Sequence, residues 1–268
     1  MPKFVRSRTA VALLPALILL SAASSGCDII TADLKAKESA EWRKTYQLQP
    51  GGRVEISNVN GKIDVTPSSD DTVEVVATKI ARGATAEAAK AALERIEIRE
   101  EATPALIKVE TKVARASGIF HGSAQVQYAI RVPASAEVRF TTVNGGIEIA
   151  GLDGRVNAET TNGGIRARDV GGPIEASTTN GGVDVELTDV KEPGVKLECT
   201  NGGIKLRLPQ DAKANLSASI TNGGIELQGI SAEQTTQPSR RRLEARLNGG
   251  GPSIRLAGTN GGIHIGPK

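Results

Sequence analysis

The sequence predicts an all-β protein, built mainly as a single-stranded β-solenoid with one short helix in its N-terminal part. Three observations lead to this fold class. A hexapeptide close to Thr-Thr-Asn-Gly-Gly-Ile recurs six times between residues 142 and 263. The residues on both sides of each copy alternate between apolar and polar in the same phase, as strands with one buried face do. Each repeat also contains a second turn, so that successive units can stack as short circuits.

The first 26 residues have the layout of a secretory signal peptide. Lys3, Arg6 and Arg8 form a basic start, and the apolar stretch 10–23 follows it. This stretch is too short to cross a bilayer and is interrupted by Pro15, which argues against a permanent membrane helix.

The end of this leader, Ser24-Ser25-Gly26-Cys27, resembles the bacterial lipobox. The resemblance implies cleavage before Cys27, a lipid attached to its thiol, and a membrane as partner through that lipid. We therefore expect an exported protein that is lipid-anchored to the cell envelope, on the periplasmic side or at the cell surface. Cleavage near residues 22–23, which leaves a free soluble protein, is the alternative.

Charge and cysteine content narrow the possible partners. The leader contains three basic and no acidic residues, so the mature chain has 33 − 3 = 30 Lys and Arg against 30 Asp and Glu. A neutral chain lacks the concentrated basic charge of nucleic-acid-binding proteins, and we expect no nucleic-acid partner. If Cys27 carries lipid, Cys199 is left alone, so disulfides do not hold this fold together.

Residues 27–41 are polar and predict a tether, and residues 42–135 predict a β-rich N-terminal part. Alternating patterns predict strands at 46–50, 53–57, 61–66, 72–80, 94–99, 106–110 and 124–132, with a loop at 114–123. The alanine-rich segment 85–96 predicts the helix, with Ala89, Ala92, Leu93 and Ile96 on one face. The stretch 54–65 follows the pattern of the later repeats and predicts a related unit.

From residue 136 to residue 268 the repeats form the predicted solenoid, continuous with the preceding part. Their asparagines mark the predicted corners: Asn144, Asn162, Asn180, Asn201, Asn222 and Asn260. A degenerate copy at 247–254 divides the last interval. The residue two before each asparagine faces inward, which makes Cys199 a small buried residue. The residue directly before faces outward, and the candidate outward edge is Thr161, Thr179, Thr200 and Thr221.

The Asn-Gly pairs leave a second arrangement open. Asn-Gly between alternating strands is also the strongest local signal for a hairpin, because both positions tolerate positive φ. A β-meander with one hairpin per motif is therefore the alternative. The second turn of each repeat, as at 151–154 and 170–173, favours the solenoid.

At the level of family, the sequence resembles the bacterial putative-adhesin domain family, an envelope-associated domain of unknown function with a β-helical shape. The resemblance rests on residues 51–65, on residues 128–156 and on the NGG repeats that follow, and it covers about 42–268. It implies a β-solenoid and is silent about biochemistry.

The ionisable residues do not form a recognisable catalytic or cofactor site. Neither His121 nor His264 has a metal ligand at a suitable spacing, and no nucleotide-binding or calcium-repeat motif occurs. The outward column Glu148, Arg166, Asp184, Lys205, Glu226 and His264 alternates in sign, which predicts charge pairing between neighbouring rungs. We therefore expect no enzyme activity, no cofactor and no metal.

Three candidate functions are compatible with these sequence features. The first is a non-enzymatic envelope lipoprotein whose solenoid is a scaffold or interaction surface for an envelope protein or glycan. The second is a β-helical enzyme or binding protein for envelope or extracellular polysaccharide, and the third is a regulatory partner of an envelope-stress system. A separate hypothesis concerns 240–242, three consecutive arginines in the longest insertion, which could contact phosphate groups of lipid or of another anionic envelope polymer.

Overall fold

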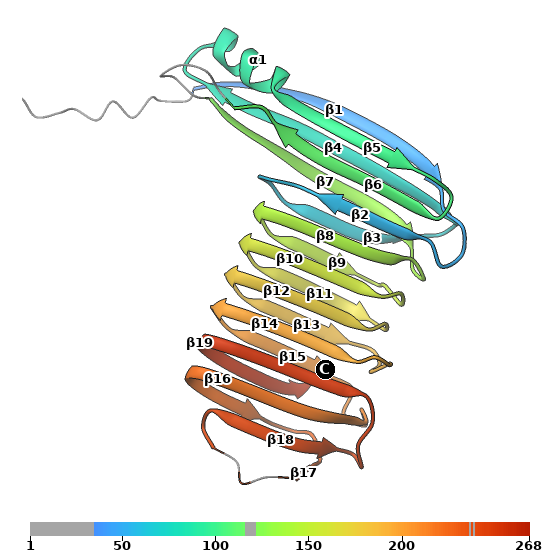
Figure 1. The fold of residues 1–268 in the computed structure, drawn as a ribbon, viewed down its shortest axis with the longest axis vertical. Coiled ribbons are helices and arrows are strands. Elements are labelled where there is room, and N and C mark those ends of the chain that lie inside the picture. The colour runs from blue at the N-terminus through green and yellow to red at the C-terminus, as the bar shows by residue number, and fades with distance from the viewer. Residues whose placement is uncertain (1–34, 116–121, 236, 238) are drawn as a thin grey trace, which may run out of the picture. The chain divides into compact units, whose positions relative to one another are not determined.

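Four Asn-Gly-Gly copies form corners between two strands, and the last two lie within the long strands Ala214–Leu227 and Ser253–Pro267. The strands of successive repeats stack into two faces (Figure 1). The computed structural model describes residues 35–115, 122–235, 237 and 239–268. The predicted leader, the predicted lipidation site Cys27 and His121 lie outside the described residues. We call the strands before the corners the A face and the strands after the corners the B face.

Four consecutive repeats form the central rungs, each with one strand on either face. The rungs are β8 (Glu137–Asn144) with β9 (Ile147–Ala150), β10 (Val156–Asn162) with β11 (Ile165–Val170), β12 (Ile174–Asn180) with β13 (Val183–Leu187), and β14 (Val195–Asn201) with β15 (Ile204–Leu208). Neighbouring rungs pair in parallel, so that Val156 lies between Val138 and Ile174. This direct stacking confirms the solenoid and excludes one hairpin per motif.

The N-terminal part continues the same stack. Strands β2 (Arg53–Ser57) and β3 (Ile63–Ser68) pair in parallel with β8 and β9, so 54–65 is a related unit, as predicted. Strands β6 (Leu106–Val113) and β7 (Ser123–Pro133) form the next level. Beyond it the pairing turns antiparallel, with β5 (Ile96–Ala102) on β6, β4 (Thr72–Gly83) on β7, and β1 (Ala36–Gln47) on β4.

The structure corrects the boundary of the predicted tether at 27–41. Residues 36–41 belong to β1 and pair with residues 78–83 of β4, because Trp42 and Tyr46 farther along this strand pack against the core. The helix α1 (Ala86–Glu94) is shorter than the predicted 85–96. Thr85 is its N-cap, accepting a hydrogen bond from the Ala88 amide, and Ala89 and Ala92 are its buried residues.

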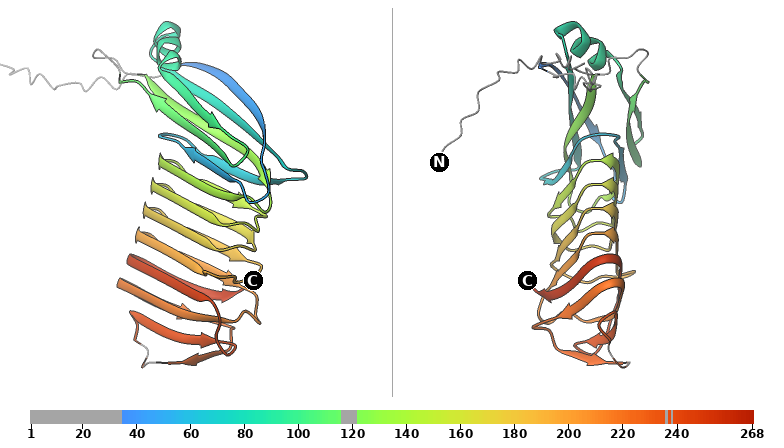
Figure 2. Two further views of the ribbon diagram at one scale, coloured as in Figure 1. Left: turned by 45° about the vertical axis from the view of Figure 1, so that its right-hand side comes forward. Right: turned by 90° about the vertical axis from the view of Figure 1, so that its left-hand side faces the viewer.

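The last repeat of the chain is not the last rung of the stack. Strand β19 (Ser253–Pro267) lies between the β14–β15 rung and β16 (Ala214–Leu227), and it pairs in parallel with all three strands. Ile263 is therefore flanked by Ile204 and Ile225. Strand β18 (Arg242–Leu247) covers the A-face half of β16, and β17 (Ala232–Gln234) pairs with β18 (Figure 2). The degenerate copy at 247–254 runs from the end of β18 into β19 and forms no corner.

The inward columns form one hydrophobic core along the stack. Ile147, Ile165, Val183, Ile204 and Ile263 are at most 1% exposed, as the alternation predicts. A polar column lies beside them at the corners. Thr160 Oγ1 donates to the Gly145 carbonyl at 2.9 Å, and the Cys199 Sγ donates to the Gly181 carbonyl at 3.0 Å. Cys199 is buried, and burial raises the pKa of its thiol.

Candidate interaction surface at the repeat corners

The corner asparagines form a continuous ladder of side-chain hydrogen bonds. In each pair the Nδ2 of one asparagine donates to the Oδ1 of its neighbour, at distances from 2.7 to 3.0 Å. The ladder runs in the order Asn222, Asn260, Asn201, Asn180, Asn162, Asn144 and Asn60. Asn60 ends it by donating to the Ala124 carbonyl at 3.2 Å. The asparagines therefore bind one another, which explains their repetition without any ligand.

The threonines of the predicted outward edge lie on the A face beside this ladder. Thr161, Thr179, Thr200 and Thr221 are exposed, and Thr259 of β19 lies between the last two in space. They form a flat row of hydroxyl groups at the spacing of parallel strands, about 4.8 Å. None of these threonines lines the trough that crosses the opposite face.

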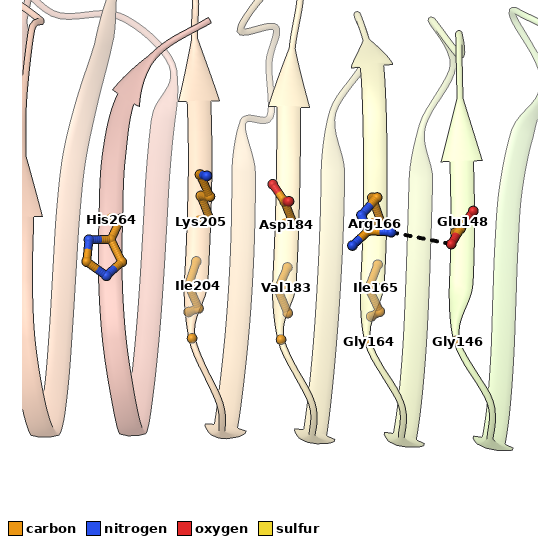
Figure 3. A pocket seen from close by; sticks show the side chains of 12 residues that line it. Gly146, Glu148, Gly164, Ile165, Arg166, Val183, Asp184, Ile204, Lys205 and His264 are labelled. Carbon is orange, nitrogen blue, oxygen red and sulfur yellow. Dashed lines mark ion pairs between the residues drawn. The ribbon is translucent and has the colours of Figure 1, made fainter.

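A shallow trough of about 500 Å³ crosses the rungs on the B face, directly after the corners (Figure 3). Its edge is a column of the second glycines of the motif, and its other residues come from the first two positions of the B-face strands. The glycines are Gly146, Gly164, Gly182 and Gly203. The charged residues are Glu148, Arg166, Asp184, Lys205 and His264, and the apolar residues are Ile165, Val183 and Ile204.

The two glycines of the motif differ in how closely the neighbouring rung approaches them. A Cβ on Gly163, the first glycine, would lie 2.0 Å from the Gly145 carbonyl oxygen of the neighbouring rung, so stacking requires glycine there. A Cβ on Gly164, the second glycine, would meet its nearest atom, the Gly182 oxygen, at 3.4 Å, which is close to ordinary contact. Stacking therefore explains the first glycine column but not the second.

One rung already has a side chain at the second position. Lys62 follows Asn60-Gly61 in the β2–β3 rung and occupies the place that glycine has in the other rungs. Its Nζ lies 2.7 Å from Asp64 and 2.9 Å from Glu148, and these contacts raise the pKa of the ammonium group. The corner thus accepts a long side chain, and the six later glycines leave open a strip that Lys62 fills at one end.

Ion pairs along the trough only partly follow the predicted alternation. Arg166 pairs with Glu148 at 3.5 Å, and His264 pairs with Glu226 at 2.9 Å. The hydrogen bond from Lys62 lowers the pKa of Glu148 below its usual value. The prediction is wrong for Asp184 and Lys205. Asp184 pairs diagonally with Arg207 at 2.9 Å, and Lys205 has His264 rather than Glu226 as its neighbour because β19 lies between their rungs.

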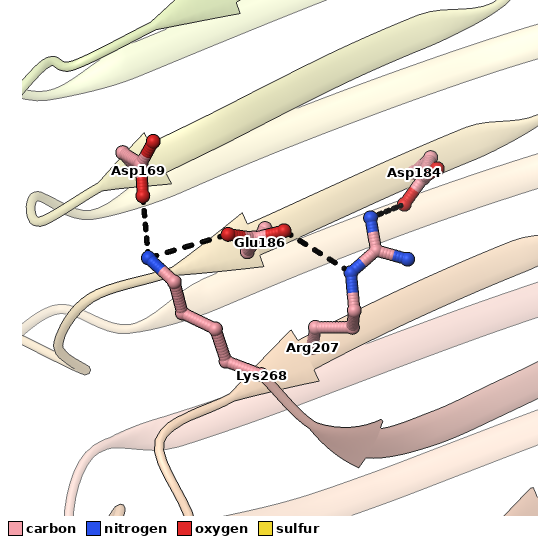
Figure 4. A network of polar contacts seen from close by, with 5 residues as sticks. All are labelled: Asp169, Asp184, Glu186, Arg207 and Lys268. Atoms are coloured by element: carbon pink, nitrogen blue, oxygen red, sulfur yellow. Dashed lines mark hydrogen bonds and ion pairs between the residues drawn. The ribbon is translucent and has the colours of Figure 1, made fainter.

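Arg207 belongs to a second network at the far ends of the B-face strands (Figure 4). Its guanidinium bridges Asp184 and Glu186, and Glu186 also pairs with Lys268 at 3.2 Å. The Lys268 ammonium contacts Asp169 as well, and its backbone amide donates to the Leu208 carbonyl. The network therefore connects Lys268 to three earlier rungs and holds β19 in register.

The structure does not bring the chemically reactive side chains together. Among the described residues, no three His, Cys, Asp or Glu side chains are arranged to hold a metal ion. No helix in the described part of the chain is long and apolar enough to span a bilayer. His264 lies beside the trough, whereas Cys199 is on the inside of the corner. The trough was not predicted from the sequence, although aligning Lys62 with the second glycines indicates that these glycines are not needed for the turn.

This fold, a two-faced β-solenoid with asparagine corners, defines a repeat protein. The chain belongs to the Toastrack DUF4097 family, whose model matches residues 54–266. The resemblance to the putative-adhesin family seen in the sequence is thereby confirmed. No curated protein matches the chain.

Solved structures of low sequence identity are similar over most of the chain. A putative cell adhesion protein from Clostridium sporogenes is 12% identical, covers 85% of this chain and 100% of its own, and has a TM-score of 0.49. A putative adhesin from Bacteroides fragilis is 8% identical, covers 85% of this chain and 97% of its own, and has a TM-score of 0.36. A putative adhesin from Parabacteroides distasonis is 11% identical over the same shares, with a TM-score of 0.26.

Proposed function

We propose that this protein is a non-enzymatic, lipid-anchored scaffold of the cell envelope that binds an extended partner along the B-face trough. The observation that carries this proposal is the column of second glycines. Stacking does not require them, and Lys62 occupies the equivalent position in another rung. Their common effect is to keep a strip of the B face free of side chains.

The form of the trough favours a linear partner over a small molecule. It crosses successive rungs at about 4.8 Å per rung and is open along its length. Its charged residues carry both signs, so a strongly charged polymer of one sign gains little net attraction. A polar segment of an envelope protein or of a glycan, with groups that pair with Arg166 and Lys205 in turn, fits this pattern best.

The anchoring part of the proposal rests on the sequence. The basic start, the short apolar stretch and the lipobox-like ending at Cys27 support export and lipid attachment. Intact-mass measurement of the membrane-extracted protein tests this part separately. A mature chain that begins at Cys27 with a diacylglycerol adduct agrees with it, and an unmodified N-terminus at another residue contradicts it.

Binding is tested by filling the trough. The double variant Gly164→Gln/Gly182→Gln places two side chains in the strip, and Ser177→Gln/Thr179→Gln places the same side chains on the A face of the β12–β13 rung. Full-length wild type and both variants are immobilised and compared for capture of envelope proteins and for binding to an array of envelope glycans. We expect a ligand that the wild type and the A-face variant retain and the trough variant loses. Equal binding by both variants overturns the trough as the site.

A further inference from the structure

The stack ends at a turn of three consecutive arginines, Arg240–Arg242, in which the scaffold function proposed above has no part. Ser239 opens the turn, and its Oγ accepts hydrogen bonds from the amides of Arg241 and Arg242 at 3.3 and 3.0 Å. The amide of Ser239 donates to the Arg242 carbonyl at 3.0 Å, and β18 starts at Arg242. The turn is thus a defined structure at the start of this strand.

The backbone carbonyl groups of this turn accept the hydrogen bonds that a further rung would accept elsewhere in the stack. In the central rungs the amide after each corner donates to a glycine carbonyl of the neighbouring rung, as Ile165 does to Gly182 at 2.9 Å. At the last corner the Ile225 amide donates instead to the Arg240 carbonyl at 3.0 Å, and the Ile220 amide donates to the Arg241 carbonyl at 2.9 Å. Carbonyl groups therefore fix the turn to β16, and the arginine side chains take no part in this.

The side chains of Arg240, Arg241 and Arg242 are exposed. Within the described part of the chain, none of the three forms an ion pair or donates a side-chain hydrogen bond. Arg246 follows on the same outward face of β18, and Glu244 between it and Arg242 is the acidic residue of that face. Some cations elsewhere pair between rungs, as Lys196 does with Glu175 at 2.8 Å. Within the described residues, the end of the stack therefore has an excess of guanidinium groups that form no ion pair.

We propose that this arginine turn, Arg240–Arg242, binds a phosphate-bearing linear polymer of the cell envelope. Guanidinium groups bind phosphate oxygens through paired, charge-assisted hydrogen bonds. Three of them on adjacent residues can contact more than one phosphate group, which favours a polymer over a single phosphate.

The position of the turn favours a polymer over a lipid headgroup. The chain enters the stack at β1, and the turn lies at the opposite end, beside β16. The paired succession between the two ends is β1, β4, β7, β3, β9, β11, β13, β15, β19 and β16, and at roughly 4.8 Å per strand it spans about 40 Å. This step rests on the anchoring at Cys27 proposed above: with that anchor, a site far from the first described strand suits a ligand that extends away from a membrane surface. This inference does not rest on the trough, which lies on other rungs.

The test uses inorganic polyphosphate as the probe and the full-length protein in detergent. The tip variant is Arg240→Ser/Arg241→Ser/Arg242→Ser. The matched control is Arg139→Ser/Arg155→Ser/Arg255→Ser, which removes the same charge from exposed arginines of the A face. Titration calorimetry at several salt concentrations measures affinity. Because the turn is held by carbonyl groups, both variants should keep the wild-type thermal unfolding midpoint within a few degrees.

We expect the tip variant to lose about tenfold or more in affinity, with a salt dependence smaller by about three counterions, and the control to change little. The trough variant Gly164→Gln/Gly182→Gln should bind polyphosphate as the wild type does. The proposal is overturned if the wild type does not bind polyphosphate, or if tip and control variants lose affinity equally. Binding to vesicles containing phosphatidylglycerol that is as tight as binding to polyphosphate also overturns it, in favour of a lipid surface.

Discussion

Asn162 donates its side-chain amide to the Oδ1 of Asn144 at 2.8 Å and accepts the corresponding bond from Asn180, also at 2.8 Å. Each inner asparagine of the ladder thus has two such bonds, whereas Asn222 at the end has only the one that it donates to Asn260 at 2.9 Å. The ladder therefore makes the corners depend on one another energetically.

The ladder predicts that the loss in free energy of unfolding, when an asparagine is replaced by alanine, depends on the position of that asparagine along the stack. Asn162→Ala breaks two side-chain hydrogen bonds and should lower the free energy of unfolding by about 1–2 kcal/mol. Asn222→Ala breaks one and should cost about half as much. Urea denaturation measures both, with Asn157→Ala, an A-face asparagine outside the ladder, as the control. Equal losses at 162 and 222 would show that the ladder contributes nothing beyond the local turn.

The two glycines of one corner should respond differently to alanine. Gly163→Ala places a methyl group 2.0 Å from a backbone oxygen, so the rungs must move apart, and we expect a loss of about 3 kcal/mol or more. Gly164→Ala makes a contact of 3.4 Å and should change the free energy of unfolding by less than about 1 kcal/mol. Denaturation of the two single variants tests this pair directly. A large loss at Gly164 would mean that the second glycine column is structural, and the proposed trough would lose its support.

The place of β19 predicts that the final repeat behaves as an interior rung. Ile263 is fully buried between two rungs, so Ile263→Ala should cost about 2–5 kcal/mol, as Ile165→Ala should in the central stack. Ile225 precedes it in sequence but is half-buried in the last rung, so Ile225→Ala should cost clearly less. Chemical denaturation of the three variants gives the order. A smaller cost at Ile263 than at Ile225 would contradict the position of β19.

The ion pair between Lys62 and Glu148, at one end of the trough, predicts that the stability of the fold depends on pH. The hydrogen bond from Lys62 depresses the pKa of Glu148 in the folded protein, so the pair stabilises the fold above the unfolded pKa of about 4.5. This contribution is lost as the pH falls through the lower, folded pKa of Glu148. NMR titration of the Glu148 carboxyl carbon should show a midpoint below 4.5 that rises in Lys62→Met. An unchanged midpoint in that variant would mean that Lys62 does not control Glu148.

Much of the fold follows from local pattern. The inward and outward columns around residues 144, 162, 180 and 201 were readable because strand side chains alternate with a period of two. The same alternation placed Thr160 and Cys199 inside. The sequence predicted that the helix exists but placed its ends less accurately. Thr85, for example, is the N-cap and not a helical residue.

The trough could not be predicted from these local sequence patterns. Sequence spacing shows that two glycines follow each asparagine, but it does not show which neighbour each one approaches. Only the distances from Gly163 and Gly164 to adjacent rungs separate the glycine that stacking requires from the glycine that it does not. The partners of Asp184 were missed for a similar reason, because its diagonal contact with Arg207 depends on side-chain direction.

The sequence by itself determined the repeating unit, its corners and the buried face of the repeat strands, because these depend on residues a few positions apart. Tertiary structure decided the order of the rungs. Strand β19 has nearly the same pattern as its neighbours, so the alternation suits any slot in the stack. Its place between β15 and β16 depends on which edges remain unpaired and on the contacts of Lys268 with Asp169 and Glu186, which lie 99 and 82 residues away. Such contacts form only between elements already brought together, and no local pattern encodes them.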